Sequence, residues 1–396
     1  MNSGTIGFPA NGQISDETRR LCLVTHRCRK NDGQGRVNYE IALAAVEAGW
    51  HVTFLGTELA DNLANHPNVR WIKVQSSKLP SGLLKYQVFA LKTARVLQRR
   101  RGEFDVIHAD GFITWGATDI NVAHFVHSGW LNCGYFPGGW FQSVHSFYQR
   151  LFTHLNSALE RIAFRQASLV VALSDRIAEE LISIGVEPKR ISIIPNGTDL
   201  KEFEPGSSTR DEFGLPEGPP LFLFAGDIRT SRKNLDSVLR ALVLVKDCHL
   251  VVAGHLEGSP FPALARKLGV TERVHFLGKV RNMPGLMRSV DAFVFPSRYE
   301  PFGLVLLEAL ASGLPVITTR LAGCSVIVGE GGAVLDNPED FKTLACWMNE
   351  LASDENLRSD IGARARRIAE DYSWDRMATQ YLQLYEKVVL AKESRA

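Results

Sequence analysis

Short apolar runs alternate with amphipathic segments along almost the whole chain, and this alternation restricts the fold more than any other feature. Strands of a parallel sheet covered by helices on both faces are buried on both sides, so they read as unbroken apolar runs. In the first half such runs lie at residues 21–26, 51–56, 104–110, 120–127, 167–174 and 191–197, with a helical pattern at 35–50. They predict a doubly wound α/β domain.

The alternation of apolar runs and amphipathic segments is interrupted near the middle of the chain and then resumes. Residues 201–220 are rich in Pro, Gly, Ser and charge, which is typical of a linker between domains. Beyond them, apolar runs at 220–227, 248–255, 272–278, 291–297 and 314–319 predict a second doubly wound domain, with helical patterns at 233–247 and 261–270. We therefore expect a mobile tail at 1–17, one domain at 18–204, a second at 205–374, and a C-terminal helix at 375–396 that packs back on one of the two domains, the first being the expected partner.

Length, charge and cysteine content narrow the class of protein. A chain of 396 residues is too long for one ordinary core. Its formal net charge of +2 gives no reason to expect a nucleic-acid partner. The six cysteines have no metal-like spacing, the start of the chain has no signal-peptide pattern, and no apolar run reaches the roughly 18 residues that span a bilayer. We expect a cytoplasmic protein with reduced thiols.

Two glutamates stand in a segment that otherwise reads as protein core. Glu300 and Glu308 lie within RYEPFGLVLLEALASGLPVIT, residues 298–318. A buried carboxylate without a partner is costly, and the neighbouring sequence offers none, so we expect a ligand rich in hydroxyl donors. A helix that starts near Gly303 or Leu304 would add backbone N–H groups that favour an anion. The alternative is that Glu300 caps this helix and Glu308 forms an ion pair.

A basic loop follows the first strand of the second domain. It contains Arg229, Arg232 and Lys233, between a predicted strand and a predicted helix. Arginine can hold phosphate through two hydrogen bonds, so the loop is suited to a diphosphate. The alternative is an ordinary solvated loop.

A partial glycine-rich fingerprint follows the first strand of the chain. Gly33 and Gly35 fit the start of G-x-G-x-x-G, but Asn38 replaces the third glycine. Glu58, after the second strand, would suit the ribose of a dinucleotide. The segment therefore fits a nicotinamide-dependent oxidoreductase or a plain tight turn.

Two histidines occur near the end of one predicted strand. If the strand over residues 120–127 alternates, only one of His124 and His127 can point into a cleft. His127 is the last strand-like residue before Ser-Gly-Trp, and a structural role is equally open for a single histidine here.

The segment from Glu300 to Glu308, with Phe302-Gly303 and the following ALASGLPVI, resembles the donor signature of retaining GT-B glycosyltransferases of family 4. The resemblance extends from about Leu21 to Tyr385. It implies that Glu300 meets the hexose hydroxyls and that Glu308 binds the ribose. Lys233 matches the family lysine, but Asp227 stands where an arginine is usual. The implied catalytic residues are His127, Glu300, Lys233 and Arg229, and the implied donor-binding residues are Gly35, Arg232, Arg281, Phe302, Gly303, Leu304 and Glu308.

The resemblance also implies a reaction and its partners. A GT-B enzyme would move a hexose, with retention, from a nucleotide-diphosphate sugar to a glycan or lipid-linked glycan, in envelope polysaccharide biosynthesis. The nucleotide sugar would be a co-substrate, with no resident cofactor. No Asp-x-Asp occurs, so a metal is not expected. The rivals are the oxidoreductase and a non-catalytic protein that binds a sugar nucleotide, which Asp227 and the altered AGCSVIV loop would favour.

Two stretches point to a further partner. Residues 83–101 form a basic helical pattern that ends in three arginines, and residues 129–152 are dense in aromatic side chains. A basic amphipathic helix beside exposed aromatic residues can rest on an anionic membrane. We expect peripheral contact with the inner face of the cytoplasmic membrane, or else a core helix with an aromatic lid.

Overall fold

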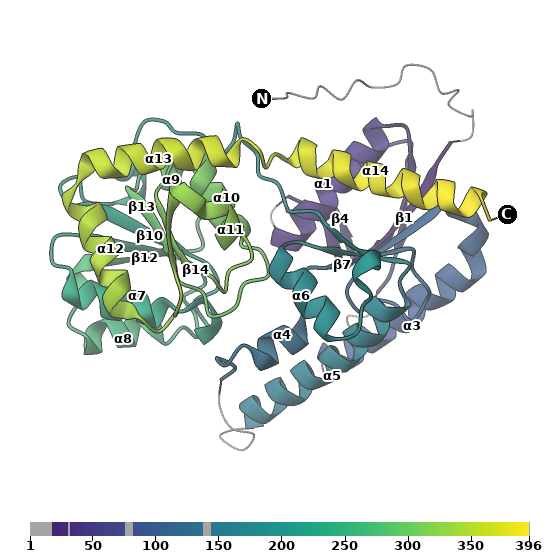
Figure 1. Cartoon of the computed structure of the whole chain (residues 1–396), viewed down its shortest axis with the longest axis horizontal. Coiled ribbons are helices and arrows are strands. Elements are labelled where there is room, and N and C mark those ends of the chain that lie inside the picture. The colour runs from purple at the N-terminus through teal and green to yellow at the C-terminus, as the bar shows by residue number, and fades with distance from the viewer. Residues whose placement is uncertain (1–17, 31, 76–81, 138–143, 396) are drawn as a thin grey trace.

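The computed structural model describes residues 18–30, 32–75, 82–137 and 144–395, so the tail expected at residues 1–17 lies outside the described residues. Two α/β domains, each built on a parallel sheet, stand side by side (Figure 1). The expected fold class is confirmed. Within the described ranges, no helix is long and apolar enough to cross a membrane.

The first domain contains a seven-stranded sheet in the order β5-β3-β1-β6-β7-β8-β9, with every neighbouring pair parallel. Its strands are β1 (Arg20–Val24), β3 (His51–Gly56), β5 (Val69–Lys73), β6 (Val106–Asp110), β7 (Ile120–Ala123), β8 (Leu169–Ala172) and β9 (Ile191–Ile193). A small ladder joins β2 (Arg27–Cys28) to β4 (Glu58–Leu59). The helices are α1 (Gly33–Glu47), α2 (Asp61–Ala64), α3 (Gly82–Arg100), α4 (His127–Asn132), α5 (Val144–Gln166) and α6 (Asp175–Ser183).

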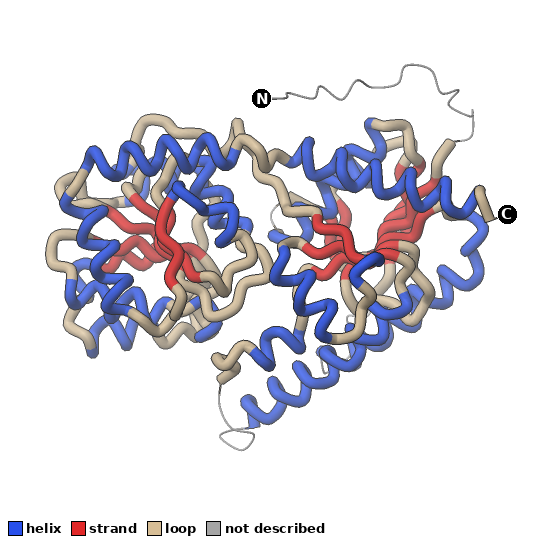
Figure 2. The backbone as a smooth tube through the Cα atoms, viewed as in Figure 1, coloured by secondary structure: helices blue, strands red, loops and turns tan. Residues whose placement is uncertain are grey.

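The second domain repeats the plan with a six-stranded sheet in the order β12-β11-β10-β13-β14-β15, again parallel throughout. Its strands are β10 (Leu221–Ala225), β11 (His249–Ala253), β12 (Val274–Gly278), β13 (Ala292–Phe295), β14 (Val316–Thr319) and β15 (Gly332–Leu335). The helices are α7 (Leu235–Leu244), α8 (Phe261–Lys267), α9 (Met283–Arg288), α10 (Leu304–Ala311), α11 (Ser325–Val328), α12 (Phe341–Ser353) and α13 (Glu355–Ala369). Helices lie on both faces of each sheet (Figure 2), which explains the unbroken apolar strands.

Each sheet has one point at which the strand order reverses. In the first sheet it lies between β1 and β6, and in the second between β10 and β13. At such a point, the loops after the two strands turn to opposite faces of the sheet. They leave a crevice at the carboxyl ends of the strands. The residues after these four strands therefore occupy the places where a doubly wound sheet binds its ligands.

The last helix, α14 (Trp374–Glu393), leaves the second domain and lies across the first, beside α1 (Figure 1). Buried tyrosines hold it there, and the hydroxyl of Tyr385 lies 2.6 Å from Nδ1 of His108 on β6. The chain thus passes between the domains twice. The two crossings are hydrogen-bonded to each other, because the amide of Thr198 donates to the carbonyl of Tyr372 at 2.8 Å and the amide of Trp374 donates to Thr198 at 3.2 Å.

A buried asparagine shapes the loop between β10 and α7. Asn234 adopts a left-handed backbone, with φ of 66°, and its side chain is fully buried. Its amide nitrogen donates to the carbonyls of Pro296 at 2.8 Å and Pro338 at 2.7 Å. Asparagine tolerates this backbone better than other residues with side chains, and only its amide can donate to both carbonyls.

We predict that Asn234→Asp lowers the free energy of unfolding by about 3 kcal/mol, because a carboxylate would face two carbonyl oxygens in the core. Asn234→Gly keeps the backbone and loses the two hydrogen bonds, so a smaller loss of about 2 kcal/mol is expected. Urea unfolding followed by circular dichroism measures both. Asn349→Asp on the exposed face of α12 is the matched control. Equal stability of Asn234→Asp and the control would contradict the assigned role.

Candidate active site

A cavity of about 620 Å³ lies between the two domains, where the carboxyl ends of both sheets face each other. The first domain contributes the start of α1, the residues after β7 and Asn196. The second contributes the loops after β10 and β13 and the start of α10. The charged or polar side chains in its lining are Gln34, His124, Asn196, Asp227, Arg232, Lys233 and Glu300.

Lys233 and Glu300 form an ion pair within this cavity. Nζ of Lys233 donates to Oε2 of Glu300, and Nη1 of Arg232 lies 3.8 Å from the same oxygen. Burial alone would raise the pKa of Glu300, but Lys233 and Arg232 outweigh it and hold that pKa below its ordinary value. Burial lowers the pKa of Lys233 despite the attraction of Glu300. The expectation that Glu300 has no protein partner is therefore wrong, since its partner is a lysine 67 positions away in the sequence.

The backbone around Glu300 is held on both sides. The loop that contains the altered AGCSVIV sequence supports it, because the amide of Glu300 donates to Leu321 at 3.1 Å and the amide of Gly323 donates to Glu300 at 2.8 Å. A Cβ at Gly323 would lie 1.8 Å from the carbonyl of Pro301, so only glycine fits. On the other side the hydroxyl of Tyr299 donates to Glu180 of α6 at 2.7 Å. Contact between the domains therefore helps to position Glu300.

The two candidate arginines lie in different surroundings. Arg229 is half-exposed and its guanidinium donates to both carboxylate oxygens of Asp227, at 2.9 Å each. Arg232 lines the cavity, lies over the ring of Phe125 at 5.4 Å, and donates to the carbonyl of Tyr299 at 3.0 Å. The structure thus brings Arg232 to the cavity with Lys233 and Glu300, and leaves Arg229 paired with Asp227.

The start of α10 also faces the cavity, through Phe302, Gly303 and Leu304. Gly303 precedes the helix with φ of 101°, and no side chain caps the first turn. Uncapped N–H groups at a helix start favour an anion. Glu308 lies one turn beyond Leu304, partly buried, and its carboxylate has no hydrogen-bond partner among the described residues. Burial raises the pKa of Glu308 to about 7, with a further increase from Glu202 and a decrease from Arg36.

The structure corrects the position of the two histidines. Strand β7 ends at Ala123, not at residue 127, so His124 is the first residue beyond the strand and lines the cavity. His127 begins α4, and its Nδ1 lies 2.7 Å from Glu160, in a neighbouring pocket of aromatic side chains. The sequence places the end of this strand four residues too late, because the apolar residues Phe125 and Val126 follow the end of the ladder.

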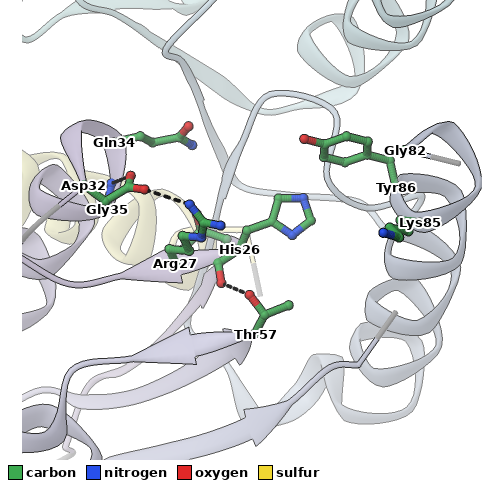
Figure 3. Close-up of a pocket in the computed structure, with 10 residues that line it drawn as sticks. His26, Arg27, Asp32, Gln34, Gly35, Thr57, Gly82, Lys85 and Tyr86 are labelled. Atoms are coloured by element: carbon green, nitrogen blue, oxygen red, sulfur yellow. Dashed lines mark hydrogen bonds and ion pairs between the residues drawn. The ribbon is translucent and has the colours of Figure 1, made fainter. Parts of the chain in front are cut away.

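Gly35 lies on the first turn of α1, in a second pocket of about 430 Å³ that adjoins the cavity at Gln34 (Figure 3). Asp32 caps the helix, because its Oδ1 accepts a hydrogen bond from the amide of Gly35 at 2.9 Å. Glu58, the candidate ribose acid, is paired with Arg29 at 2.8 Å. Arg281 is exposed after β12, outside the cavity lining. No group of three or more potential metal ligands occurs within the described residues.

Known proteins resemble the chain along most of its length. Two family models match it: Glycosyltransferase Family 4 over residues 31–202 and Glycosyl transferases group 1 over residues 207–368. An uncharacterized glycosyltransferase of Methanocaldococcus jannaschii is 27% identical over 352 residues, which cover 82% of this chain and 87% of that protein.

Two solved structures share the fold. Sucrose-phosphate synthase from Thermosynechococcus elongatus has a TM-score of 0.78 and 21% identity, over 94% of this chain and 100% of that one. Anabaena HepE in complex with UDP-glucose has a TM-score of 0.70 and 20% identity, over 93% and 99% of the two chains.

The raised pKa of Glu308 predicts a pH-dependent stability. The folded state keeps this proton up to about pH 7, whereas the unfolded chain releases it near its ordinary value of 4.5. Stability therefore falls between those two values as pH rises. We expect Glu308→Gln to raise the free energy of unfolding at pH 8 by about 2 kcal/mol, with little change at pH 5. Urea unfolding at both pH values tests this, and a gain of the same size at pH 5 would contradict it.

Proposed function

The chain belongs to the family 4 glycosyltransferases, which have the GT-B fold, and from this premise we propose that it transfers a hexose, with retention, from a nucleotide-diphosphate sugar. The proposed acceptor is a glycan or a lipid-linked glycan, in the synthesis of an envelope polysaccharide. The observation that carries the donor assignment is the cluster of Lys233, Glu300 and Arg232 in the cavity between the domains.

Two cations and one helix start surround the place proposed for the diphosphate. Arg232 and Lys233 carry positive charge on one wall, and the uncapped N–H groups of α10 lie beside them. Such groups stabilise the negative charge that develops on a leaving diphosphate. HepE was solved with UDP-glucose, so a uridine nucleotide is the first donor to test.

Glu300 is proposed to exchange part of its pairing when the donor binds. Without a ligand its carboxylate is held by Lys233. A diphosphate would attract Lys233, and the carboxylate would then accept hydrogen bonds from hexose hydroxyls. His124, on the opposite wall, takes the sugar-facing place that the sequence assigned to His127. Glu308 remains the proposed acceptor for the ribose hydroxyls.

In the proposed reaction the bond between the anomeric carbon and the diphosphate oxygen breaks, and a bond from that carbon to the acceptor oxygen forms on the same face. The acceptor proton passes to an oxygen of the departing phosphate. No resident cofactor or metal is part of this scheme. Closure of the cavity around the donor would exclude water and limit hydrolysis.

The oxidoreductase alternative is not favoured. Its ribose acid would be Glu58, which is paired with Arg29, and both family models are those of glycosyltransferases. A non-catalytic sugar-nucleotide protein has one observation on its side, because Asp227 is bound to Arg229 where the family has an arginine. Enzymatic turnover separates this alternative from the proposal.

We also propose that the first domain rests on an anionic membrane. Helices α3 and α5 run along the lower side of this domain as drawn in Figure 1, and only the end of α3 approaches α14. Their exposed apolar side chains include Tyr86, Leu91, Tyr148, Leu151, Leu155 and Ile162. Arg95 and Arg99 are exposed on α3 one and two turns beyond Leu91, so basic and apolar side chains share a face. Such a face suits a surface of anionic lipid.

The donor assignment predicts that one nucleoside diphosphate among UDP, GDP and ADP raises the melting temperature, whereas NAD does not. Arg232→Ala, Lys233→Ala and Glu308→Ala should each abolish most of that shift. Arg232→Ala should also lower the rate of nucleoside diphosphate release from the matching nucleotide sugar on the order of 100-fold or more.

Arg229→Ala is the matched control, because it removes an arginine from the same loop without removing a side chain that lines the cavity. It should keep at least about half of the shift and of the rate. A greater loss with Arg229→Ala than with Arg232→Ala would reverse the assignment of the two arginines. Stabilisation by NAD alone would contradict the proposed function.

The membrane proposal predicts co-sedimentation with vesicles that contain an anionic phospholipid and none with neutral vesicles. The double change Arg95→Glu and Arg99→Glu should reduce the bound fraction on the order of tenfold. Arg266→Glu with Lys267→Glu, on exposed positions of α8, alters the charge equally and should leave binding unchanged. Equal losses with both double variants would contradict a defined docking face.

A further inference from the structure

A buried carboxylate lies behind the cavity wall in the first domain. Asp110 is the last residue of β6, beside the point where the order of the first sheet reverses, and its side chain is 1% exposed. Asp110 has no role in the donor chemistry above, yet four polar side chains from α1, β6 and the residue after β7 surround it: Gln34, Asn38, His108 and His124.

One oxygen of Asp110 is fixed by two amides from α1. Oδ2 accepts from Nδ2 of Asn38 at 2.7 Å and from Nε2 of Gln34 at 3.0 Å. Asn38 also donates to the hydroxyl of Thr25 at 3.1 Å. These donors leave the other oxygen, Oδ1, to face two imidazole rings. Nε2 of His124 lies 3.3 Å from Oδ1, and Nε2 of His108 lies 3.5 Å from it.

The carboxylate stays ionised in this position. Burial alone would raise the pKa of Asp110, but His124 and His108 outweigh burial and hold that pKa well below its ordinary value. An ionised carboxylate only accepts hydrogen bonds. A protonated Nε2 on each imidazole would complement this charge across contacts of 3.3 and 3.5 Å, which are ion-pair distances and not formed hydrogen bonds.

His108 is consistent with this assignment at its other nitrogen. Nδ1 of His108 lies 2.6 Å from the hydroxyl of Tyr385 on α14. Burial raises the pKa of Tyr385 well above its ordinary value, so the phenol keeps its proton and is able to donate it to Nδ1. This arrangement allows His108 to accept at Nδ1 from the phenol and to turn a protonated Nε2 toward the carboxylate.

His124 differs from His108 at Nδ1, because only Nδ1 of His108 has a hydrogen-bond partner among the described residues. Its Nε2 is buried against Asp110, while the ring lines the donor cavity. Within the described part of the chain, no side chain or backbone group is hydrogen-bonded to its Nδ1. The remaining nitrogen is therefore placed to meet a ligand.

We propose that Asp110 is a positioning residue that fixes His124 as its neutral Nε2–H tautomer, so that Nδ1 accepts a hydrogen bond from a hydroxyl group of the ligand in the cavity. This inference rests on the proposed function, because the ligand is taken to be the sugar of the donor or its acceptor. It also gives a reason for Asn38, which replaces the third glycine of the partial fingerprint and instead holds Asp110.

The test compares wild type, Asp110→Asn and His124→Gln, in the full chain labelled with ¹⁵N-histidine. Long-range ¹H–¹⁵N spectra distinguish a protonated from an unprotonated ring nitrogen, and His124→Gln assigns the signals. We expect protonated Nε2 and unprotonated Nδ1 for His124 in neutral buffer. In Asp110→Asn, Gln34 and Asn38 keep the amide oxygen on their side, so the new amide nitrogen faces His124 and reverses its tautomer.

The kinetic arm measures release of nucleoside diphosphate from the nucleotide sugar selected by thermal shift. Asp110→Asn should lower kcat on the order of 100-fold, while the nucleotide-induced thermal shift is retained. Tyr385→Phe is the matched control, because it removes the hydroxyl at His108 and leaves Asp110 and His124 in place. It should lower the melting temperature and preserve the tautomer of His124.

Each outcome decides a separate point. An Nδ1–H or doubly protonated His124 in wild type overturns the inference. This spectrum of the wild type requires neither enzymatic turnover nor a variant that folds. Unchanged kcat in Asp110→Asn also overturns it. If wild type releases no nucleoside diphosphate from any nucleotide sugar, the proposed function is at fault, and the tautomer of wild-type His124 alone decides the inference.

Discussion

A charge inside a protein has to be paired or hydrogen-bonded, and the arrangement of both domains around the cavity follows from that constraint. Glu300 is balanced by Lys233, and Asp110 is balanced by amides and imidazoles. Each of these sets joins residues that are far apart in the sequence and that meet at the carboxyl ends of a parallel sheet. Glu308 is the exception, since no group of the described residues is hydrogen-bonded to its carboxylate and burial raises its pKa to about 7. We propose that a ligand completes the structure at such an unbalanced group.

The sequence predicts the fold well, because strands buried on both faces leave a continuous apolar signal. The strands at β10, β11 and β13 match their apolar runs within a residue or two at each end. The signal fails where burial is uneven. Strand β5 is half-exposed at one edge of its sheet, and β15 is a short edge strand. Neither stands out in the sequence, and the run that contains β7 continues past the end of the strand.

The candidate site is harder to predict, because its chemistry depends on which side chains meet. The motif predicts that Glu300, Lys233 and Gly303 belong together, and all three line one cavity. It does not reveal that Lys233 neutralises Glu300, since the two are in separate loops. Asp110 gives no signal at all, because an acidic residue at the end of an apolar strand is unremarkable until the topology brings His124 beside it. The sequence indicates only that one of His124 and His127 faces the cavity. Which of the two does so depends on where β7 ends, and this strand ends at Ala123.

The two crossings between the domains have a mechanical consequence. Because Thr198 is hydrogen-bonded to both Tyr372 and Trp374, the outgoing and returning segments are tied together at one place. Such a tie favours rotation about that line as the domain motion, once the contact between Tyr299 and Glu180 separates. Rotation of this kind would govern the width of the cavity by a single angle. A ligand that contacts both walls must match the distance between them, and this distance depends on that angle. The connection between the domains would therefore select ligands by their length as well as by their chemistry.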